Sequence, residues 1–284
     1  MVASARELWR ALEPLHGMIY FAPEAHDRYT ALGLDHTAGY FASRAAALGP
    51  VSAEVVIATF YNFNPALVRG AIPSAWEKTT PQALLAARAD AADAALRRGL
   101  GELAERDGEI EELAGLARRA AEHACTTPHG RPLFAAHAAQ PWPEQPLRVL
   151  WWAQTLLREY RGDGHLTALL THDLSGIEAL VVHSGSGEIP AESLRRTRGW
   201  ATEEWDAAVD RLRERGVVDG DGVLTEAGRE LRERVEALTD QLAEGPYSVL
   251  DHTDRDRYTH LTRPLTTTIL TAGMIPHKKP PTKN

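Results

Sequence analysis

The amino-acid sequence predicts a mainly α-helical protein with two helical halves, the second of which contains a winged helix-turn-helix with a small β-hairpin wing. Three observations support this fold class. Alanine and leucine recur at helical spacing along almost the whole chain, and alternating β-branched runs are scarce. Residues 189–243 also follow the order helix, turn, helix, short hairpin and long helix, which is the plan of a winged helix.

The composition is that of a globular chain, and it limits the function. The 284 residues are 44% hydrophobic and 25% charged, with a formal net charge of −8. These values argue against a disordered chain and against a protein that binds nucleic acid with its whole surface. The single cysteine, Cys125, excludes an intramolecular disulfide and a cysteine-rich metal site. No run approaches eighteen apolar residues and the N-terminus lacks an apolar signal stretch, so we expect a cytoplasmic protein with no membrane partner.

The first half, residues 1–140, contains a clear amphipathic helix at 81–98. Thr80 before the first proline is a good N-cap, and Gly99 is a good stop. A second helix is expected over 101–123. The apolar stripe of the first of these helices is formed by Leu85, Ala89, Ala92 and Leu96.

A proline-rich segment at 130–146 marks the boundary with the second half, residues 141–272. Helical spacing then continues over 145–160 and 164–182. The last nine residues contain three prolines and three lysines, so 273–284 is predicted to be a flexible tail.

The first half also carries a weaker helix-turn-helix pattern. Ala45, Gly49 and Val55 stand at the spacing of the alanine, the turn glycine and the apolar position of that motif. If both halves are winged-helix-like, the chain is a tandem whose interface is a natural pocket.

In the second half, the winged helix begins with a short helix over 191–197. A turn at 198–200 leads into a helix capped by Thr202. Residues 217–224 predict two strands joined by an Asp-Gly turn, and Thr225 caps the last helix. The apolar stripe of this last helix can pack within the chain or against a second copy, as in a homodimer, and consists of Leu231, Val235, Leu238 and Leu242.

The helix that would enter a DNA groove is acidic at its start. It carries four carboxylates before its first basic residue, Arg211, although phosphates repel carboxylates and base readout favours Arg, Lys, Asn and Gln. A small basic cluster, Arg195, Arg196 and Arg198, precedes this helix. We therefore expect no DNA binding by this unit, unless the basic cluster combines with that of a dimer mate.

Two resemblances follow from these patterns. Residues 211–231, RLRERGVVDGDGVLTEAGREL, resemble the MarR family of winged-helix proteins. Nearly the whole chain is similar to the actinobacterial SalK-type helix-turn-helix family, through LEPLH at 12–16, YFAPE at 20–24, FYNFNPALV at 60–68, IPSAW at 72–76, LREYRGDGH at 157–165 and RGW at 198–200. The second resemblance implies two helical halves and neighbours in natural-product gene clusters, but no agreed reaction and no catalytic residue.

The RGDGH motif at 161–165 is the main candidate site. Its glycines predict a turn between two helices, in which Arg158, Arg161, Asp163 and His165 converge. We interpret His165 as an acid or base whose pKa is lowered by a helix N-terminus, Asp163 as the residue that orients it, and the arginines as partners of an anionic or carbonyl oxygen. The alternative is a structural turn, in which Asp163 caps a helix and the arginines pair with nearby acids.

Other candidates lie in the first half. His16, in an apolar run, is either a satisfied core histidine or a catalytic pocket base. Side chains that either line the pocket or serve the core and helix ends are Tyr20, Tyr61, Asn62, Asn64, Trp76 and Trp152. No cofactor is expected. The alternative is a metal or haem held by His16, His165 and His183, without an HExxH pattern.

Together these patterns predict a protein that binds a small molecule between its halves and acts on it by His/Arg/Asp acid–base chemistry. The resemblance to the SalK-type family implies a place in natural-product metabolism. The alternative function is a ligand-responsive, MarR-like transcriptional regulator. A third is a structural or interaction protein whose pocket is filled.

Overall fold

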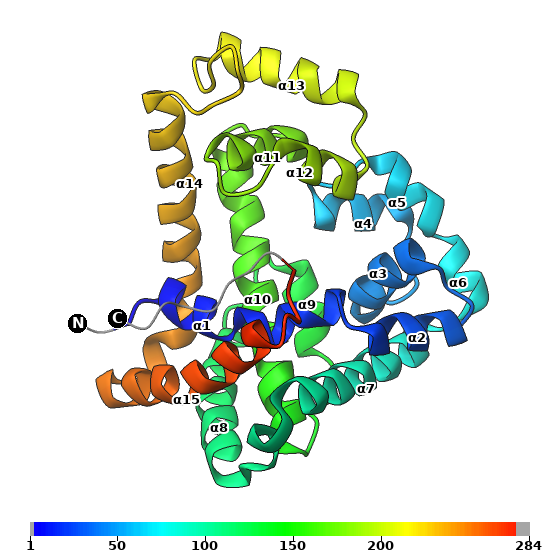
Figure 1. Ribbon diagram of the computed structural model, residues 1–284, viewed down its shortest axis with the longest axis vertical. Coiled ribbons are helices and arrows are strands. Elements are labelled where there is room, and N and C mark those ends of the chain that lie inside the picture. The colour runs from blue at the N-terminus through cyan, green and yellow to red at the C-terminus, as the bar shows by residue number, and fades with distance from the viewer. Residues whose placement is uncertain (1–2, 277–284) are drawn as a thin grey trace.

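The computed structural model describes residues 3–276, and in this part of the chain nearly all regular structure is helical (Figure 1). No β-strand forms within these residues, so the prediction of a mainly α protein is confirmed. The first nine α-helices are α1 (Ala5–Gly17), α2 (Pro23–Ala31), α3 (His36–Ala45), α4 (Ala53–Phe60), α5 (Pro65–Ala71), α6 (Ser74–Lys78), α7 (Pro81–Leu100), α8 (Asp107–Ala124) and α9 (Pro132–Ala138). The others are α10 (Pro146–Thr171), α11 (Gly176–Gly185), α12 (Ala191–Arg198), α13 (Thr202–Glu214), α14 (Glu226–Glu244) and α15 (His252–Thr271).

Local sequence signals set where several helices begin. The Ser4 hydroxyl accepts from the Glu7 N–H while the Glu7 carboxylate accepts from the Ser4 N–H, which is a capping box at α1. The same arrangement of Ser175 and Glu178 begins α11. Thr80 caps α7 as predicted, and this helix continues to Leu100.

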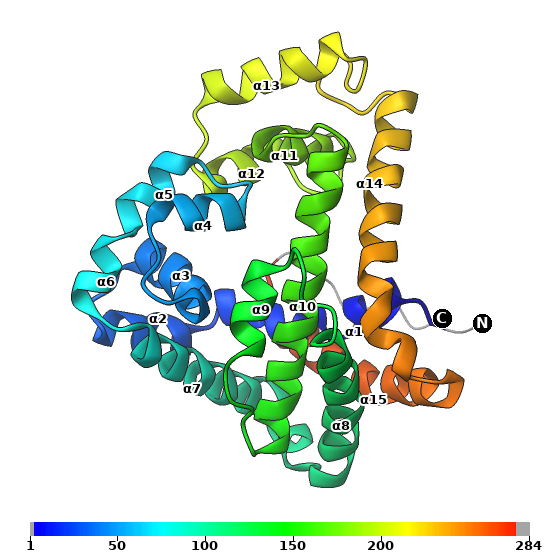
Figure 2. The same cartoon turned by 180° about the vertical axis from the view of Figure 1, so that it is seen from behind.

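Two hydrophobic clusters form the interior. The first unites α1–α9 with the first half of α10 and with α15, and the second unites the end of α10 with α11–α14. We call each cluster, together with the helices around it, a body. α10 runs through the centre of both views and joins the two bodies (Figures 1 and 2). The clusters therefore separate within α10, at about residues 160–168, and not at the proline-rich segment 130–146, which belongs to the first body.

The predicted turn at 161–165 is wrong, because RGDGH lies in the interior of α10. His165 therefore does not stand at a helix N-terminus. The two glycines lower the intrinsic helix propensity, but close packing compensates for it. A Cβ atom on Gly164 would lie 2.8 Å from Arg131 Nη1 and 3.3 Å from Leu242 Cβ, so the glycine lets α14 and Arg131 approach α10 closely.

In the second body, the two helices of the predicted helix-turn-helix are present as α12 and α13. Gly199 turns the chain between them with a φ of +75°, and α13 begins at Thr202, with Ala201 rather than Thr202 at the N-cap position. In the first body, α3 and α4 stand on either side of Gly49, whose φ is +83°.

The predicted β-hairpin wing is not formed. Only one isolated antiparallel bridge joins Val218 to Leu224. The Asp219 carboxylate accepts from the N–H groups of Asp221 and Val223, both at 3.0 Å, and so closes residues 219–223 into a tight loop. Too few residues remain on either side of this loop to build a ladder.

The apolar stripe of α14 is used inside the chain. Leu231 and Val235 are buried in the second cluster, and Leu238 packs against it. Beyond α15, Met274 and Ile275 are buried in the first cluster. The rest of the predicted tail, 277–284, lies outside the described residues.

Residues 3–276 contain no single helix with the length and apolar character needed to cross a membrane. Only the pair His36–Leu48 and Ala53–Phe60 reaches such a length and composition together, across a bend of 94°.

Candidate functional site

A cavity of about 1060 Å³ lies between the two bodies, which we call the central cavity. Its walls come from α1, α3, α4, α9, α10, α11, α12, α14 and α15. Eight arginines but only five acidic residues line it, in a chain whose net charge is −8. The arginines are Arg6, Arg10, Arg44, Arg158, Arg161, Arg198, Arg232 and Arg263; the acidic residues are Glu13, Glu159, Asp163, Glu188 and Glu236.

The central cavity gathers part of the predicted site. Sequence candidates in its walls are Asn62, Arg158, Arg161, Asp163, His165 and His183. Tyr61 lines an adjoining hollow of about 260 Å³ that shares both histidines with the cavity. His16, Tyr20, Asn64, Trp76 and Trp152 lie elsewhere.

His165 is held in one orientation by α14. Its Nδ1 lies 2.9 Å from the Thr239 hydroxyl, and that hydroxyl donates its only hydrogen to the Val235 carbonyl at 2.7 Å. Nδ1 must therefore be the donor to Thr239, which leaves Nε2 as the unprotonated nitrogen of the neutral ring. Burial, together with the positive charge of Arg161, lowers the pKa of His165. The ring is therefore a neutral base at the cavity wall.

Asp163 does not contact His165. Its Oδ2 accepts from the Phe134 N–H at 2.9 Å, so it caps the N-terminal turn of α9 from a neighbouring helix. Burial raises the pKa of Asp163, the α9 amides lower it and Glu159 raises it, so that the pKa is about 6. The structural alternative predicts a cap in a turn between two helices, whereas Asp163 lies inside α10 and caps α9.

Asp163 should consequently make stability depend on pH. Because its pKa rises from 3.8 to about 6 on folding, its favourable contribution is present below pH 3.8 and is lost as the pH rises through 6. The Asp163→Asn variant keeps an acceptor for the α9 amide and removes this pH-dependent contribution to stability. We expect its free energy of unfolding, relative to the wild type, to rise by about 2 kcal/mol between pH 4 and pH 8 in urea titrations. The same change at the exposed cap of α3, Asp35→Asn, is the control. An equal rise in both variants would contradict the assignment.

Arg161 joins α10 to α14. It donates to Asp240 at 2.8 Å and to Glu236 at 3.4 Å, and it lies over the Trp9 ring. Arg6 reaches the same two carboxylates from α1. The Arg161 guanidinium is thus occupied by protein carboxylates.

In the wall of the central cavity, five side chains form a network that sequence reasoning did not assemble; two of them, Glu159 and Arg44, are buried, and the other three are partly buried. Glu159 lies 3.2 Å from Arg158 and 3.6 Å from Arg44, and Arg44 donates to the Tyr40 hydroxyl at 2.8 Å. Glu13 also pairs with Arg158, at 3.2 Å. Burial opposes the charge on Glu159, but the two guanidinium groups lower its pKa to about 2. The residues come from α1, α3 and α10, so no local spacing connects them.

Tyr40 and Arg198 complete this wall. Burial would raise the pKa of the Tyr40 phenol, but the charges of Arg44, Arg198 and Arg158 lower it further than burial raises it. Among the described residues Arg198 has no carboxylate partner; its Nη1 donates to the Thr197 hydroxyl at 3.0 Å, and its guanidinium lies over the Phe63 ring at 4.8 Å. Burial lowers the pKa of Arg198. Its Nε is buried without a hydrogen-bond partner in the described chain.

Two of the remaining candidates, Asn64 and Trp76, have roles in the framework. The Asn64 side chain accepts from the Ala66 N–H at the start of α5 and donates to Glu204 of α13. The Trp76 indole donates to the Val51 carbonyl at 2.9 Å. His16 is fully buried, with its ring stacked on Trp151 and edge-on to Tyr20.

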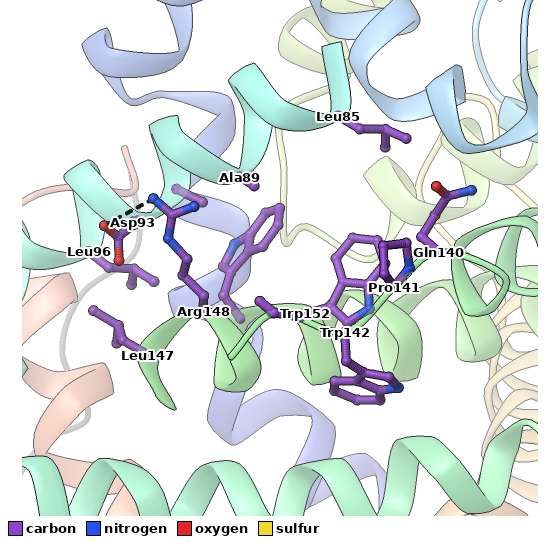
Figure 3. A pocket seen from close by; sticks show the side chains of 13 residues that line it. Leu85, Ala89, Asp93, Leu96, Gln140, Pro141, Trp142, Leu147, Arg148 and Trp152 are labelled. Carbon is purple, nitrogen blue, oxygen red and sulfur yellow. Dashed lines mark ion pairs between the residues drawn. The ribbon is translucent and has the colours of Figure 1, made fainter. Parts of the chain in front are cut away.

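Trp152 lines a separate apolar pocket of about 280 Å³ between α7 and α10 (Figure 3). Trp142 and Trp151 share its wall, and the ion pair of Arg148 with Asp93 stands at its edge. This pocket holds little polar surface and no histidine.

The three histidines of the metal alternative do not meet. His16 lies in the first body, while His165 and His183 line the central cavity. Within residues 3–276, no group of three His, Cys, Asp or Glu side chains is placed to hold a metal ion.

The exposed face of α13 is acidic. Trp205, Ala208 and Leu212 are buried, whereas Glu203 and Asp206 face solvent. Arg198, one of the three arginines of the predicted basic cluster, lines the central cavity. Fewer cations therefore stand beside α13 than the sequence indicates.

No curated protein and no solved structure matches the chain significantly. Residues 5–276 match a protein family described as a helix-turn-helix family. Because this match covers nearly the whole length, and because α12 and α13 form the expected helix pair, the chain belongs to this helix-turn-helix family.

Proposed function

We propose that this protein binds a small organic anion in the central cavity and acts on it by acid–base chemistry. The observation that carries the proposal is the excess of arginine over acidic residues in the walls of a cavity inside an acidic chain. A cavity of about 1060 Å³ is large enough for a small organic molecule. Phe60, Phe63 and Trp9 add apolar and aromatic surface for its body.

Arg198 is the best anchor for the anion. Most of the other arginines in the wall already pair with carboxylates, so they would add little to the binding energy of a further negative charge. These paired arginines are Arg6, Arg44, Arg158, Arg161 and Arg232. Arg198 has no such partner among the described residues, and the Phe63 ring holds it in place. A guanidinium in this position offers a planar pair of donors to a carboxylate or sulfonate.

His165 is the proposed general base. The Thr239 hydroxyl fixes its Nδ1–H, so Nε2 is the atom that removes a proton from a bound molecule. The resulting imidazolium would be stabilised by Glu236, whose charge opposes the lowering of the His165 pKa by burial. The resemblance to the SalK-type family suggests natural-product metabolism as the setting.

The test uses the fluorescent organic anion 8-anilinonaphthalene-1-sulfonate as the probe. We expect saturable binding to the native protein, about tenfold weaker in Arg198→Met, because a hydrogen bond to a charged group contributes about 1.5–3 kcal/mol. Arg196→Met removes an exposed arginine two residues away on α12 and is the matched control. His165→Gln should leave probe binding unchanged and slow turnover of any substrate by about 10²–10⁴-fold.

Two outcomes would contradict the proposal. One is equal probe affinity in Arg198→Met and Arg196→Met. The other is micromolar binding of a random DNA duplex that weakens steeply with salt, which would favour the MarR-like regulator. The acidic exposed face of α13 is the reason to expect no binding at roughly tens of micromolar protein.

A further inference from the structure

Arg88 is a buried cation without a counter-ion among the described residues. It interrupts the apolar stripe of α7 and is only 2% exposed. Its one hydrogen bond is long, 3.5 Å from Nη1 to the Ser43 carbonyl, and its Nε and Nη2 have no partner in the described chain. A buried guanidinium that lacks a counter-charge is strongly unfavourable.

Further unpartnered groups belong to a row of ring contacts that begins at Arg88. Its guanidinium is 5.4 Å from the centre of the Trp151 ring, on which His16 stacks at 5.3 Å, and Tyr20 is 5.9 Å from His16. The Trp151 indole N–H, both ring nitrogens of His16 and the Tyr20 hydroxyl are buried without hydrogen-bond partners among residues 3–276. Burial and three neighbouring arginines lower the pKa of His16 well below its usual range, so its ring is neutral. The unpartnered set is therefore rich in donors.

The charged side chains around His16 leave one positive charge in excess, because three arginines, Arg44, Arg88 and Arg158, act on this ring. Arg44 and Arg158 stand against Glu159 and Glu13, which balances two charges with two. The unmatched charge is that of Arg88. One monovalent anion would neutralise it, whereas a dianion would leave a buried negative charge.

We propose that Arg88, His16, Tyr20 and Trp151 form a buried binding site for a monovalent carboxylate, between α1, α7 and α10. The carboxylate would lie against the Arg88 guanidinium and accept from the neighbouring neutral donors. Tyr20 connects this carboxylate site to the central cavity, because Arg44 and Arg158 in the cavity wall lie 5.6 and 5.5 Å from its ring. The site is separate from the proposed function, since it shares neither Arg198 nor His165.

Thermal unfolding of the full chain tests the site, with acetate, phosphate or chloride at equal ionic strength and constant pH. The wild type should gain stability with acetate over chloride, and phosphate should not reproduce the gain. Arg88→Met should lose the acetate response and be at least as stable as the wild type in chloride, because it removes an unpaired buried charge. Tyr20→Phe, which removes only a hydroxyl, should need about tenfold more acetate for the same shift.

Two controls separate this site from other effects. Arg148→Met also removes an arginine beside Trp151, but one that pairs with Asp90 and Asp93, so it should keep the acetate response. Arg198→Met should also keep the acetate response, even if the sulfonate probe no longer binds in the central cavity. An unchanged acetate response in Arg88→Met would overturn the proposal. So would a wild type that does not respond to acetate, whatever the stability of Arg88→Met.

Discussion

The Glu159→Gln variant is expected to be destabilised by about 3–5 kcal/mol, the largest effect of any single side-chain change in the buried network. Glu159 is 3% exposed and is the carboxylate shared by Arg44 and Arg158. Removing its charge leaves two buried guanidinium groups with only Glu13 beside them. Urea unfolding at pH 7 measures the loss.

The pH dependence of the wild type provides a second measurement of Glu159. Because its pKa falls from 4.5 to about 2 on folding, its stabilising contribution is present above pH 4.5 and is lost as the pH falls toward 2. Glu159→Gln should lack this part of the acid unfolding curve. Glu122→Gln, on the exposed face of α8 and paired with Arg118, is the control and should change stability by less than about 1 kcal/mol. A small loss in both variants would mean that the network contributes little.

The sequence predicted the helices well because their signals are local. Caps such as Thr80 and Thr225, and stripes such as that of α7, involve residues within one or two turns of each other. The prediction failed at RGDGH because the fate of Gly164 depends on Arg131 and α14, which are distant in sequence. It failed at the wing because the Asp219 carboxylate favours a closed loop over a ladder.

The candidate site was predicted in part for the same reason. Arg158, Arg161 and His165 stand three and four residues apart, so one face of α10 carries all three toward the central cavity over two turns. Their partners could not be predicted, because Arg44, Tyr40 and Thr239 belong to other helices and no spacing relates them to the motif. The sequence indicates Arg198 only as part of a basic cluster that could contact DNA, since its position in the sequence gives no sign that it lines the central cavity.

Gly176→Ala should destabilise the protein by about 3 kcal/mol, at the upper end of the usual overpacking cost. A Cβ atom at Gly176 would lie 2.0 Å from the Tyr61 carbonyl oxygen and 3.0 Å from the Asn62 Cα. Both neighbours are backbone, so a side-chain rotation cannot relieve the overlap. The measurement is the free energy of unfolding in urea.

The position of this contact makes the variant informative about the cavity as well. The segment 61–64 joins the two bodies: the Tyr61 hydroxyl donates to the Leu174 carbonyl, and the Asn62 carbonyl accepts from the Trp200 indole. Moving this segment away from α11 should also weaken binding of the sulfonate probe, because Asn62 lines the central cavity. Gly115→Ala, at an exposed and uncrowded position of α8, makes the same chemical change and should instead stabilise by about 0.5–1 kcal/mol. Opposite signs in the two variants would show that Gly176 is required by the contact between the bodies, whereas equal stabilities would show that the contact yields without cost.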